Sequence, residues 1–328
     1  MLISGPVWSG PMSRWSVTIV KNIKDWNILR ESSALDGLFY DLRFHTYHVG
    51  RRFNWRHLII FKGSEPVAGM VGAVDKDRFI SQPGASFGGI LYRRNIASNN
   101  LINIVEMIIN FLRSTGIREI EVRLPPIVYF NPESEIELLA LSYNRFTLLR
   151  STVTSIIDLK QEDLIGNLKS PTRRGARKAE RSGIEITQSD IITNFYPVLK
   201  KDRESLGKIP THTLEELIRL RDLFPDRIVL FLARQDDKIL GGTLLFIINQ
   251  KVVLNFYLAQ TEEAKRFRVA NYLALRSITW AKENGYDYYD FGTSMLDGRI
   301  NPGLLRFKEG FGSRSYLRRF LVWKEEPR

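Results

Sequence analysis

The chain has 328 residues, of which 44% are hydrophobic and 26% are charged. These are ordinary proportions for a folded protein with a sizeable core. The sequence has no apolar run of about 18 residues, so it predicts no membrane span. It also has no cysteine, which excludes disulfides, thiolate metal sites, iron–sulfur clusters and a cysteine nucleophile.

The formal net charge of +12 favours polyanionic partners: nucleic acid, a nucleotide or diphosphate ligand, or an anionic membrane surface. The first lysine or arginine is Arg14 and no long apolar block precedes it, so the sequence predicts no signal peptide. We therefore expect a cytoplasmic location, either free in the cytoplasm or peripheral at the inner membrane face. Gly, Pro and Ser predict a flexible tail over 1–15, and both Met1 and Met12 fit as the start.

The first half of the chain is predicted to contain several strands and two helices, the first of which starts at 25–29. Hydrophobic patterning predicts strands at 16–20, 57–62, 67–74 and 117–124, and an amphipathic helix at 100–113. The Gly-rich loop 81–89 lacks the order of a phosphate-binding loop. His45 and His48 lie three residues apart without an acidic partner pattern, so we expect half-buried aromatic packing there and no metal site.

The second half repeats this order. Strands are predicted at 227–233, 239–248, 252–259 and 286–291, and a charged loop at 261–268 leads into a helix at 269–284. Both halves therefore run through strands and a glycine-terminated helix to a further strand, which indicates a duplicated α/β unit. We expect an N-terminal domain over 16–150 and a C-terminal domain over 151–328.

The most charged segment lies between the halves, at 168–183. Ser170 or Thr172 can cap a helix, on which five cations recur at helical spacing against one acid, Glu180; the cations are Arg173, Arg174, Arg177, Lys178 and Arg181. A solvated helix face is one interpretation. Anion binding is favoured, because a bound anion relieves the self-repulsion.

A second notable stretch lies near the C-terminus. Residues 286–294 alternate aromatic and acidic side chains like a strand and end in Gly292-Thr-Ser294, and Asn301-Pro302 is a strong helix opening. Lys308 then lies between Phe307 and Phe311. A cation between aromatics just past a strand end is where α/β folds place ligand chemistry. The alternative is a surface helix with a solvated lysine.

These segments resemble the Fem family of peptidoglycan-bridge aminoacyltransferases and the Fem-like acyltransferases of the GNAT superfamily. The resemblance rests on the basic helix, on Tyr289-Asp-Phe-Gly-Thr-Ser294, on Gly303-Leu-Leu-Arg-Phe-Lys-Glu-Gly-Phe-Gly312, and in the first half on 44–48 and Ser86-Phe-Gly-Gly89. It covers nearly the whole chain. It implies an α/β (α+β) fold of two tandem GNAT-like acyltransferase domains with mixed sheets.

The resemblance also implies a function in cell wall biogenesis. In Fem enzymes the donor is an aminoacyl-tRNA and the acceptor is the stem peptide of a peptidoglycan precursor, and a Phe-Lys pair matching Phe307-Lys308 is functional. Acetyl-CoA-dependent relatives carry an Arg/Gln-x-x-Gly-x-Gly/Ala loop, whereas this chain has Lys265-Arg-Phe-Arg-Val-Ala270, without glycine. A long helical hairpin of the kind that some Fem proteins use for tRNA is also missing.

The leading hypothesis is an acyl- or aminoacyltransferase that acts on an amine of a phosphate-bearing envelope precursor. Lys308 would stabilise the developing oxyanion, with Phe307 shaping the site. Asp290 would take the proton of the amine, or would hold a turn or Lys308. The candidate substrate- and phosphate-binding residues are Arg173, Arg174, Arg177, Lys178, Lys265, Arg266, Arg268, Asn271 and Ser294.

Two alternatives stay open. One is an acetyl-CoA-dependent N-acetyltransferase of sugar or polysaccharide intermediates, and the other is a non-enzymatic nucleic-acid-binding protein that owes its affinity to charge. No cofactor is expected to be permanently bound, and the donor is either an aminoacyl-tRNA or an acyl-CoA. The sequence contains no evident Ser-His-Asp or Cys-His set, which disfavours a covalent acyl-enzyme.

Overall fold

The structure is a computed structural model that describes residues 8–9, 14–50 and 53–326. The chain folds into two compact units. Unit 1 comprises Met1–Tyr40, Arg51–Ser151 and Leu317–Arg328, and unit 2 comprises Asp41–Gly50 and Thr152–Tyr316. Most of the tail expected over 1–15, including both candidate start residues, lies outside the described residues.

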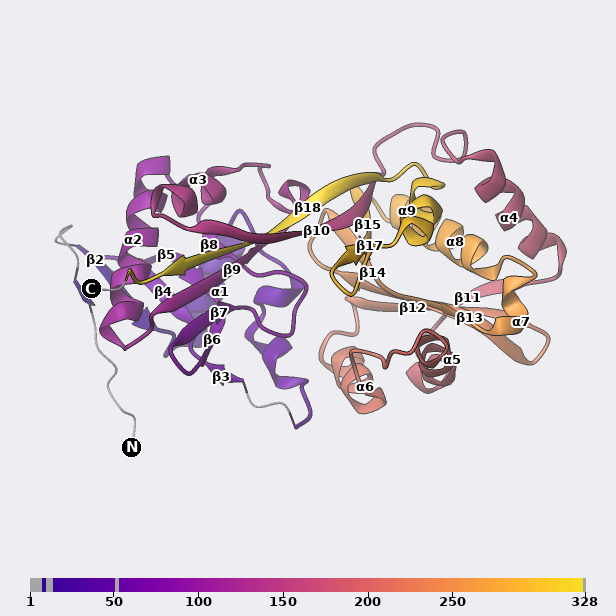
Figure 1. Cartoon of the computed structure of the whole chain (residues 1–328), viewed down its shortest axis with the longest axis horizontal. Helices are drawn as coiled ribbons and strands as arrows, with labels where there is room; N and C mark the ends of the chain where they lie inside the picture. The colour runs from indigo at the N-terminus through magenta and orange to yellow at the C-terminus, as the bar shows by residue number, and fades with distance from the viewer. Residues whose placement is uncertain (1–7, 10–13, 51–52, 327–328) are drawn as a thin grey trace. The chain divides into compact units, whose positions relative to one another are not determined.

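Unit 2 is built on a mixed sheet with the strand order β11-β12-β13-β14-β15-β10 (Figure 1). Neighbouring strands are antiparallel except β14 and β15, which are parallel. The strands are β10 (Thr147–Asp158, which begins in unit 1), β11 (Glu185–Ser189), β12 (Ile228–Gln235), β13 (Lys238–Ile247), β14 (Val252–Gln260) and β15 (Tyr288–Thr293). A short hairpin of β16 (Met295–Leu296) and β17 (Arg299–Ile300) follows.

Helices cover both faces of this sheet. In Figure 1, α8 lies on one face of β12 to β14, and α5 and α6 lie on the other. The helices of unit 2 are α4 (Ser170–Arg181), α5 (Ile192–Glu204), α6 (Leu214–Leu223), α7 (Glu262–Lys265), α8 (Val269–Glu283) and α9 (Pro302–Glu309). Helix α8 packs on the sheet because Val269, Leu273 and Ala281 recur on one helical stripe and are buried.

The parallel pair in unit 2 is short. Residues 252–254 of β14 pair with 288–290 of β15, yet β14 continues to Gln260 and β15 to Thr293. The register between β13 and β14 also shifts between Leu244 and Leu245, which marks a β-bulge. The two strands therefore part beyond their first residues and form a fork at their carboxyl ends, where open α/β sheets bind ligands.

Unit 1 contains two groups of strands. One follows the order β1-β2-β4-β5-β8 and the other the order β18-β9-β7-β6-β3. Its strands are β1 (Trp8–Ser9), β2 (Trp15–Ile19), β3 (Asn54–Trp55), β4 (Leu58–Lys62), β5 (Glu65–Met70), β6 (Gly72–Asp75), β7 (Arg78–Ser81), β8 (Ile90–Tyr92), β9 (Glu119–Leu124) and β18 (Arg314–Lys324, which begins in unit 2).

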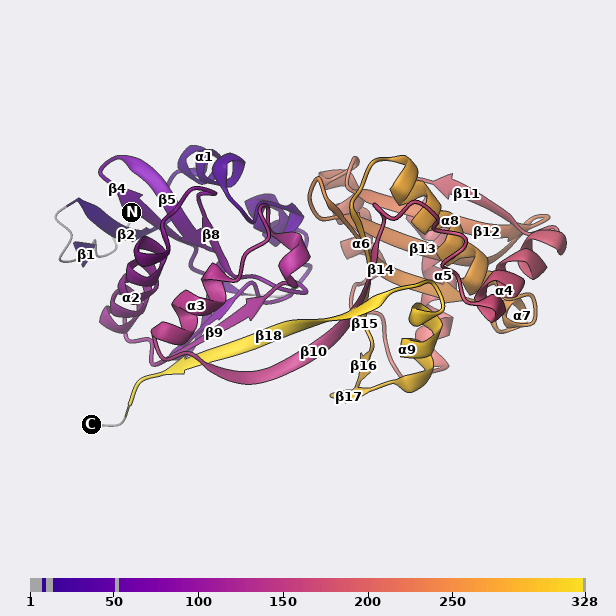
Figure 2. The same ribbon diagram turned by 90° about the horizontal axis from the view of Figure 1, so that it is seen from above.

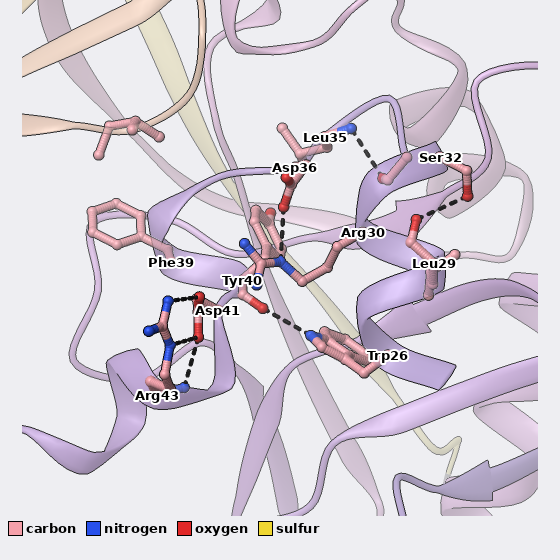
Figure 3. A network of polar contacts seen from close by, with 12 residues as sticks. Trp26, Leu29, Arg30, Ser32, Leu35, Asp36, Phe39, Tyr40, Asp41 and Arg43 are labelled. Atoms are coloured by element: carbon pink, nitrogen blue, oxygen red, sulfur yellow. Dashed lines mark hydrogen bonds and ion pairs between the residues drawn. The ribbon is translucent and has the colours of Figure 1, made fainter. Parts of the chain in front are cut away.

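The helices of unit 1 are α1 (Ile23–Ser32), α2 (Ser98–Ser114) and α3 (Ile136–Tyr143). The segment after α1 is fixed by polar contacts: the Trp26 indole donates to the Tyr40 carbonyl at 2.8 Å, and Arg30 Nε bonds Asp36 Oδ1 at 2.9 Å (Figure 3). The strand after α2 is parallel to an earlier one, β7, just as the strand after α8 is parallel to β14. Both units therefore contain a mixed sheet, as the sequence predicts.

Two local features differ from the sequence-based expectation. The strand expected over 67–74 is divided between β5 and β6, which belong to different sheets. The chain changes sheet at Val71, whose carbonyl accepts the Gln82 amide at 3.1 Å. In addition, the short 3-10 helix η2 (Leu42–Thr46) belongs to unit 2, where the Tyr47 hydroxyl lies 3.0 Å from His212 Nε2.

No helix within the described ranges is long and apolar enough to cross a bilayer. Over residues 14–50 and 53–326, no group of three or more His, Asp or Glu side chains is arranged to hold a metal ion. His45 is buried, and its ring lies edge-on to Phe44 with the ring centroids 6.2 Å apart.

Glu137 of α3 predicts a pH-dependent stability. Burial raises the pKa of Glu137 from 4.5 to about 8, although its Oε1 accepts the Ile90 amide at 2.6 Å. The folded chain keeps a proton that the unfolded chain releases, so Glu137 should lower stability by about 1.4 kcal/mol per pH unit as the pH rises from the lower value to the upper one. Burial lowers the pKa of His57 from 6.5 to about 4, which contributes the opposite slope below pH 6.5, so a net fall is expected between pH 6.5 and about 8.

Glu137→Gln should abolish this fall in urea denaturation between pH 6.5 and about 8, where His57 no longer contributes. The exposed Glu106 of α2 supplies the control, because Glu106→Gln should keep the slope of the parent protein. An unchanged slope in Glu137→Gln would show that Glu137 is not the titrating group.

Candidate active site

A cavity of about 370 Å³ lies at the fork, and we term it the fork pocket. Such a volume is within the range of about 300–1,000 Å³ that is common for ligand pockets. The polar residues that line it are Asp202, Gln260, Lys265, Arg268 and Asn271, and the apolar ones are Leu258, Ala259, Ala270, Leu304 and Phe307. These residues come from α5, the end of β14, the α7–α8 segment and α9.

The α7–α8 segment contains no glycine, yet one of its residues has the left-handed backbone conformation that favours glycine. Arg268 has φ 64° and ψ 36°, the left-handed region, at the first glycine position of the Arg/Gln-x-x-Gly-x-Gly/Ala pattern. Its side chain is exposed. The Lys265 ammonium is bound to Glu262 Oε2 at 2.5 Å, which raises the pKa of Lys265.

Gln260 connects the end of β14 to the start of α8. Its Oε1 accepts the Ala270 amide at 3.1 Å, so one of the orphan amides at the N-terminus of α8 is already satisfied. The backbone amide of Gln260 donates to Asp202 Oδ1 at 3.4 Å. A phosphate at this helix terminus would compete with the Gln260 side chain for the Ala270 amide.

Asp202 is the one acidic residue in the described lining of the fork pocket. Its side chain is 16% exposed, and Oδ2 accepts from Arg203 Nη1 at 2.6 Å. Burial raises the pKa of Asp202, and the neighbouring charge of Arg203 lowers it. The fork pocket therefore carries one carboxylate at α5 and two cations at the α7–α8 segment.

Helix α9 begins at Asn301, whose side chain caps it by accepting the Leu304 amide at 2.9 Å, as the sequence predicts. Figure 2 shows α9 beside the hairpin of β16 and β17. Phe307 lines the fork pocket and packs against Phe291 and Phe311, with ring centroids 6.3 and 5.3 Å away.

The Lys308 side chain is not part of the described lining of the fork pocket and is only 4% exposed. Its ammonium donates to the carbonyls of Gly292 and Thr293 at 2.8 and 2.5 Å. Asp290 is fully buried and accepts from the Thr154 hydroxyl and from the Gly292 amide, the latter at 2.7 Å. Both residues therefore fix the end of β15, and the described lining of the fork pocket includes neither.

Two further candidates lie outside the pocket lining. The buried Ser294 hydroxyl lies 3.1 Å from the Ser155 hydroxyl. Arg266 forms an ion pair with Glu263 at 3.1 Å and its guanidinium lies over the Phe267 ring. Of the residues predicted from sequence, the structure brings together Lys265, Arg268, Asn271 and Phe307 at the fork pocket.

The basic helix α4 packs through a face of small residues. Gly175 approaches Asn271 so closely that a Cβ at this position would lie 3.1 Å from its side chain. Arg173 is half-buried and donates to the carbonyls of Gly166 and Leu168 at 3.0 and 3.2 Å. The remaining cations, Arg174, Arg177, Lys178 and Arg181, are exposed and form no ion pair within the part of the chain that the structure describes.

Sequence reasoning missed the lining residues contributed by α5 and β14. The sequence predicts Asp202 on the solvated face of an amphipathic helix, so no local pattern identifies it as a pocket residue. Gln260 had a weak signal, because it ends a buried strand directly before the helix cap Thr261. Leu258 and Ala259 read as ordinary strand residues.

Comparison with known proteins identifies the fold. Residues 167–309 match the family model described as an acetyltransferase (GNAT) domain. The chain is similar to the crystal structure of FemX, with a TM-score of 0.69 and 12% identity over 94% of this chain and 97% of that chain. No curated protein sequence matches the chain.

Two other solved structures show the same likeness. L-PGS from Bacillus licheniformis has a TM-score of 0.62 and 12% identity over 94% of this chain and 93% of that one. A tandem GNAT protein from the clavulanic acid biosynthesis pathway has a TM-score of 0.54 and 12% identity over 96% and 99% of the two chains. The resemblance to Fem-like and GNAT proteins is thus confirmed as a shared fold, and the matched segment includes the fork pocket. The predicted fold of two tandem GNAT-like domains with mixed sheets is confirmed by these comparisons.

Because Arg268 is left-handed, glycine should be more stable than alanine at this position, the reverse of the usual order in a helix. Glycine tolerates this conformation and alanine does not, so Arg268→Gly should be more stable than Arg268→Ala by about 0.5–1 kcal/mol. At Arg266, which has φ −61°, the order should reverse because alanine is the better helix residue. Urea denaturation of the four variants measures both differences, and the same order at both sites would contradict the strained loop.

The buried ammonium of Lys308 predicts a loss of stability in Lys308→Met. The substitution leaves the Gly292 and Thr293 carbonyls without this donor. We expect the free energy of unfolding to fall by about 2–4 kcal/mol. Arg306→Met, at an exposed position of the same helix, should change it little. Equal stability of the two variants would show that Lys308 does not hold the end of β15.

Proposed function

We propose that this chain, which has a GNAT-like fold, is an acyltransferase that transfers an acyl or aminoacyl group to an amine of a phosphate-bearing cell-envelope precursor. The observation that carries the proposal is the fork pocket, which lies inside the GNAT domain of a chain that shares the fold of FemX over most of its length. The finer assignment to a peptidoglycan or polysaccharide precursor rests on that likeness.

The reaction makes modest demands on the protein. The nitrogen of the acceptor attacks the acyl carbonyl carbon, a C–N bond forms, and the C–O bond of an ester donor or the C–S bond of a thioester donor breaks. The nitrogen loses a proton and the leaving group gains one. Leu304 and Phe307 offer apolar walls for the acyl group, and Arg268 offers a positive charge to the donor.

The loop at α8 supports an aminoacyl ester rather than an acyl-CoA as donor. A diphosphate needs open backbone amides, which glycines provide, whereas here Gln260 already occupies the Ala270 amide. The exposed cations of α4 supply a surface for the phosphates of a tRNA or of the acceptor. The same positive charge supports a peripheral contact with the anionic inner membrane face.

A second candidate is an acetyl-CoA-dependent N-acetyltransferase of sugar intermediates. It is favoured by the match of residues 167–309 to an acetyltransferase (GNAT) domain. Arg268 and Lys265 then serve as the cations for the diphosphate, and Gln260 moves away from the Ala270 amide when the donor binds.

A donor screen separates the two. We expect transfer from charged tRNAs to amine-bearing envelope precursors, measured by mass spectrometry of the product, and no transfer from acyl-CoAs. Transfer from acyl-CoAs alone supports the second candidate. A chain that transfers from neither class, on any amine-bearing precursor, contradicts the proposal.

The α4 surface should contribute to donor binding in a salt-dependent way. Replacing Arg174, Arg177 and Lys178 with Gln should weaken tRNA binding and flatten its dependence on salt, since each lost phosphate contact removes about one released counterion. Replacing Lys21, Lys24 and Lys76, three exposed lysines of unit 1, with Gln changes the net charge equally and should preserve the slope. Equal effects of the two triple variants would show that only net charge matters.

A further inference from the structure

The fork pocket carries both kinds of charge. Lys265, which is bound to Glu262, lies close enough to Asp202 for their charges to interact. Arg268 faces the pocket from the α7–α8 segment, and its side chain has no ion pair within the described residues. Asp202 faces it from α5, on the opposite face of the sheet from α8. A ligand that fills the pocket therefore meets a cation at one place and a carboxylate at another.

Asp202 is held in one orientation and keeps acceptor capacity. Arg203 binds its Oδ2 at 2.6 Å, and the Gln260 amide approaches its Oδ1 at 3.4 Å. An ionised carboxylate offers about four acceptor positions, so these two contacts leave room for a further donor. Arg203 itself lies over the Tyr257 ring, 5.8 Å from the centroid, which fixes the partner of the carboxylate as well.

A carboxylate in this place opposes an anion and favours a cation. Burial already raises the pKa of Asp202, so a second negative charge beside it would be costly, whereas an ammonium would favour the ionised form. The Ala270 amide is occupied by Gln260, so the adjoining helix terminus does not compensate an anion there either. The chain carries a net charge of +12, so an acid in the lining of the fork pocket stands out against the overall charge.

We propose that Asp202 binds the ammonium group of the amine-bearing substrate in the fork pocket. The assignment rests on the proposed function, which requires an amine, and it names the residue that recognises it. The ammonium has two sources: the α-ammonium of an aminoacyl group, or an amine at the end of an alkyl chain on the acceptor. In either case it donates to the free acceptor positions of Asp202.

Binding of small probes to the full chain tests this proposal without turnover. We would titrate L-alaninamide, which carries an α-ammonium, and n-butylamine, which carries a terminal one, and follow amide resonances by NMR. Lactamide and n-butanol are the neutral counterparts, with a hydroxyl in place of the ammonium. At least one amine should bind about tenfold more tightly than its neutral counterpart, because hydrogen bonds between charged groups contribute most.

Asp202→Asn should remove that preference, because it keeps the shape and loses the charge. Glu204→Gln removes a carboxylate from the same helix outside the pocket lining, and it should leave the preference unchanged. If Asp202→Asn does not fold, Asp202→Glu, which keeps the charge and moves it, should weaken the amine more than its neutral counterpart.

The outcomes separate this inference from the proposed function. An amine that binds no better than its neutral counterpart, or a preference that persists in Asp202→Asn, overturns the role of Asp202 even where transfer activity is found. A preference that depends on Asp202 in a chain without transfer activity supports the ammonium site and counts against the transferase proposal. The amine that shows the larger preference identifies the source of the ammonium.

Discussion

The candidate site depends on the short parallel pairing between β14 and β15. Three residues of each strand pair, and then the strands part while both continue. A sheet that opens in this way leaves the carboxyl end of β14, the start of α8 and helix α9 around one space. The fork pocket therefore lies where these two strands diverge, and α5 adds Asp202 to its lining.

Buried polar groups keep the fork open. Once β15 leaves its neighbour, the carbonyls of Gly292 and Thr293 lose the partners that a sheet would supply, and an unpaired buried carbonyl is costly. The Lys308 ammonium donates to both, and Asp290 accepts the Gly292 amide. These contacts give Lys308 and Asp290 a structural task that precedes any part in the chemistry.

Much of the fold follows from local sequence signals. The apolar stripe of α8, the Asn301 cap of α9 and the basic helix α4 are each visible in short windows, since helix periodicity and capping are local properties. Local sequence signals and the resemblance predict only some of the residues that line the fork pocket. Arg268, Asn271 and Phe307 follow from the resemblance, whereas Asp202 and Gln260 meet only through tertiary packing. The direction of Lys308 also depends on packing, because a short helix between two aromatics fits either orientation.

The absence of cysteine from the sequence permits a direct test of the fork pocket as the substrate site. A single cysteine in Leu304→Cys, at a 37% exposed pocket position, would be labelled with a bulky maleimide; Leu149→Cys, at a 48% exposed position of unit 1, is the control. We expect the label at position 304 to abolish both amine binding and transfer, and the label at 149 to preserve both. Full binding and transfer with position 304 labelled would contradict the account.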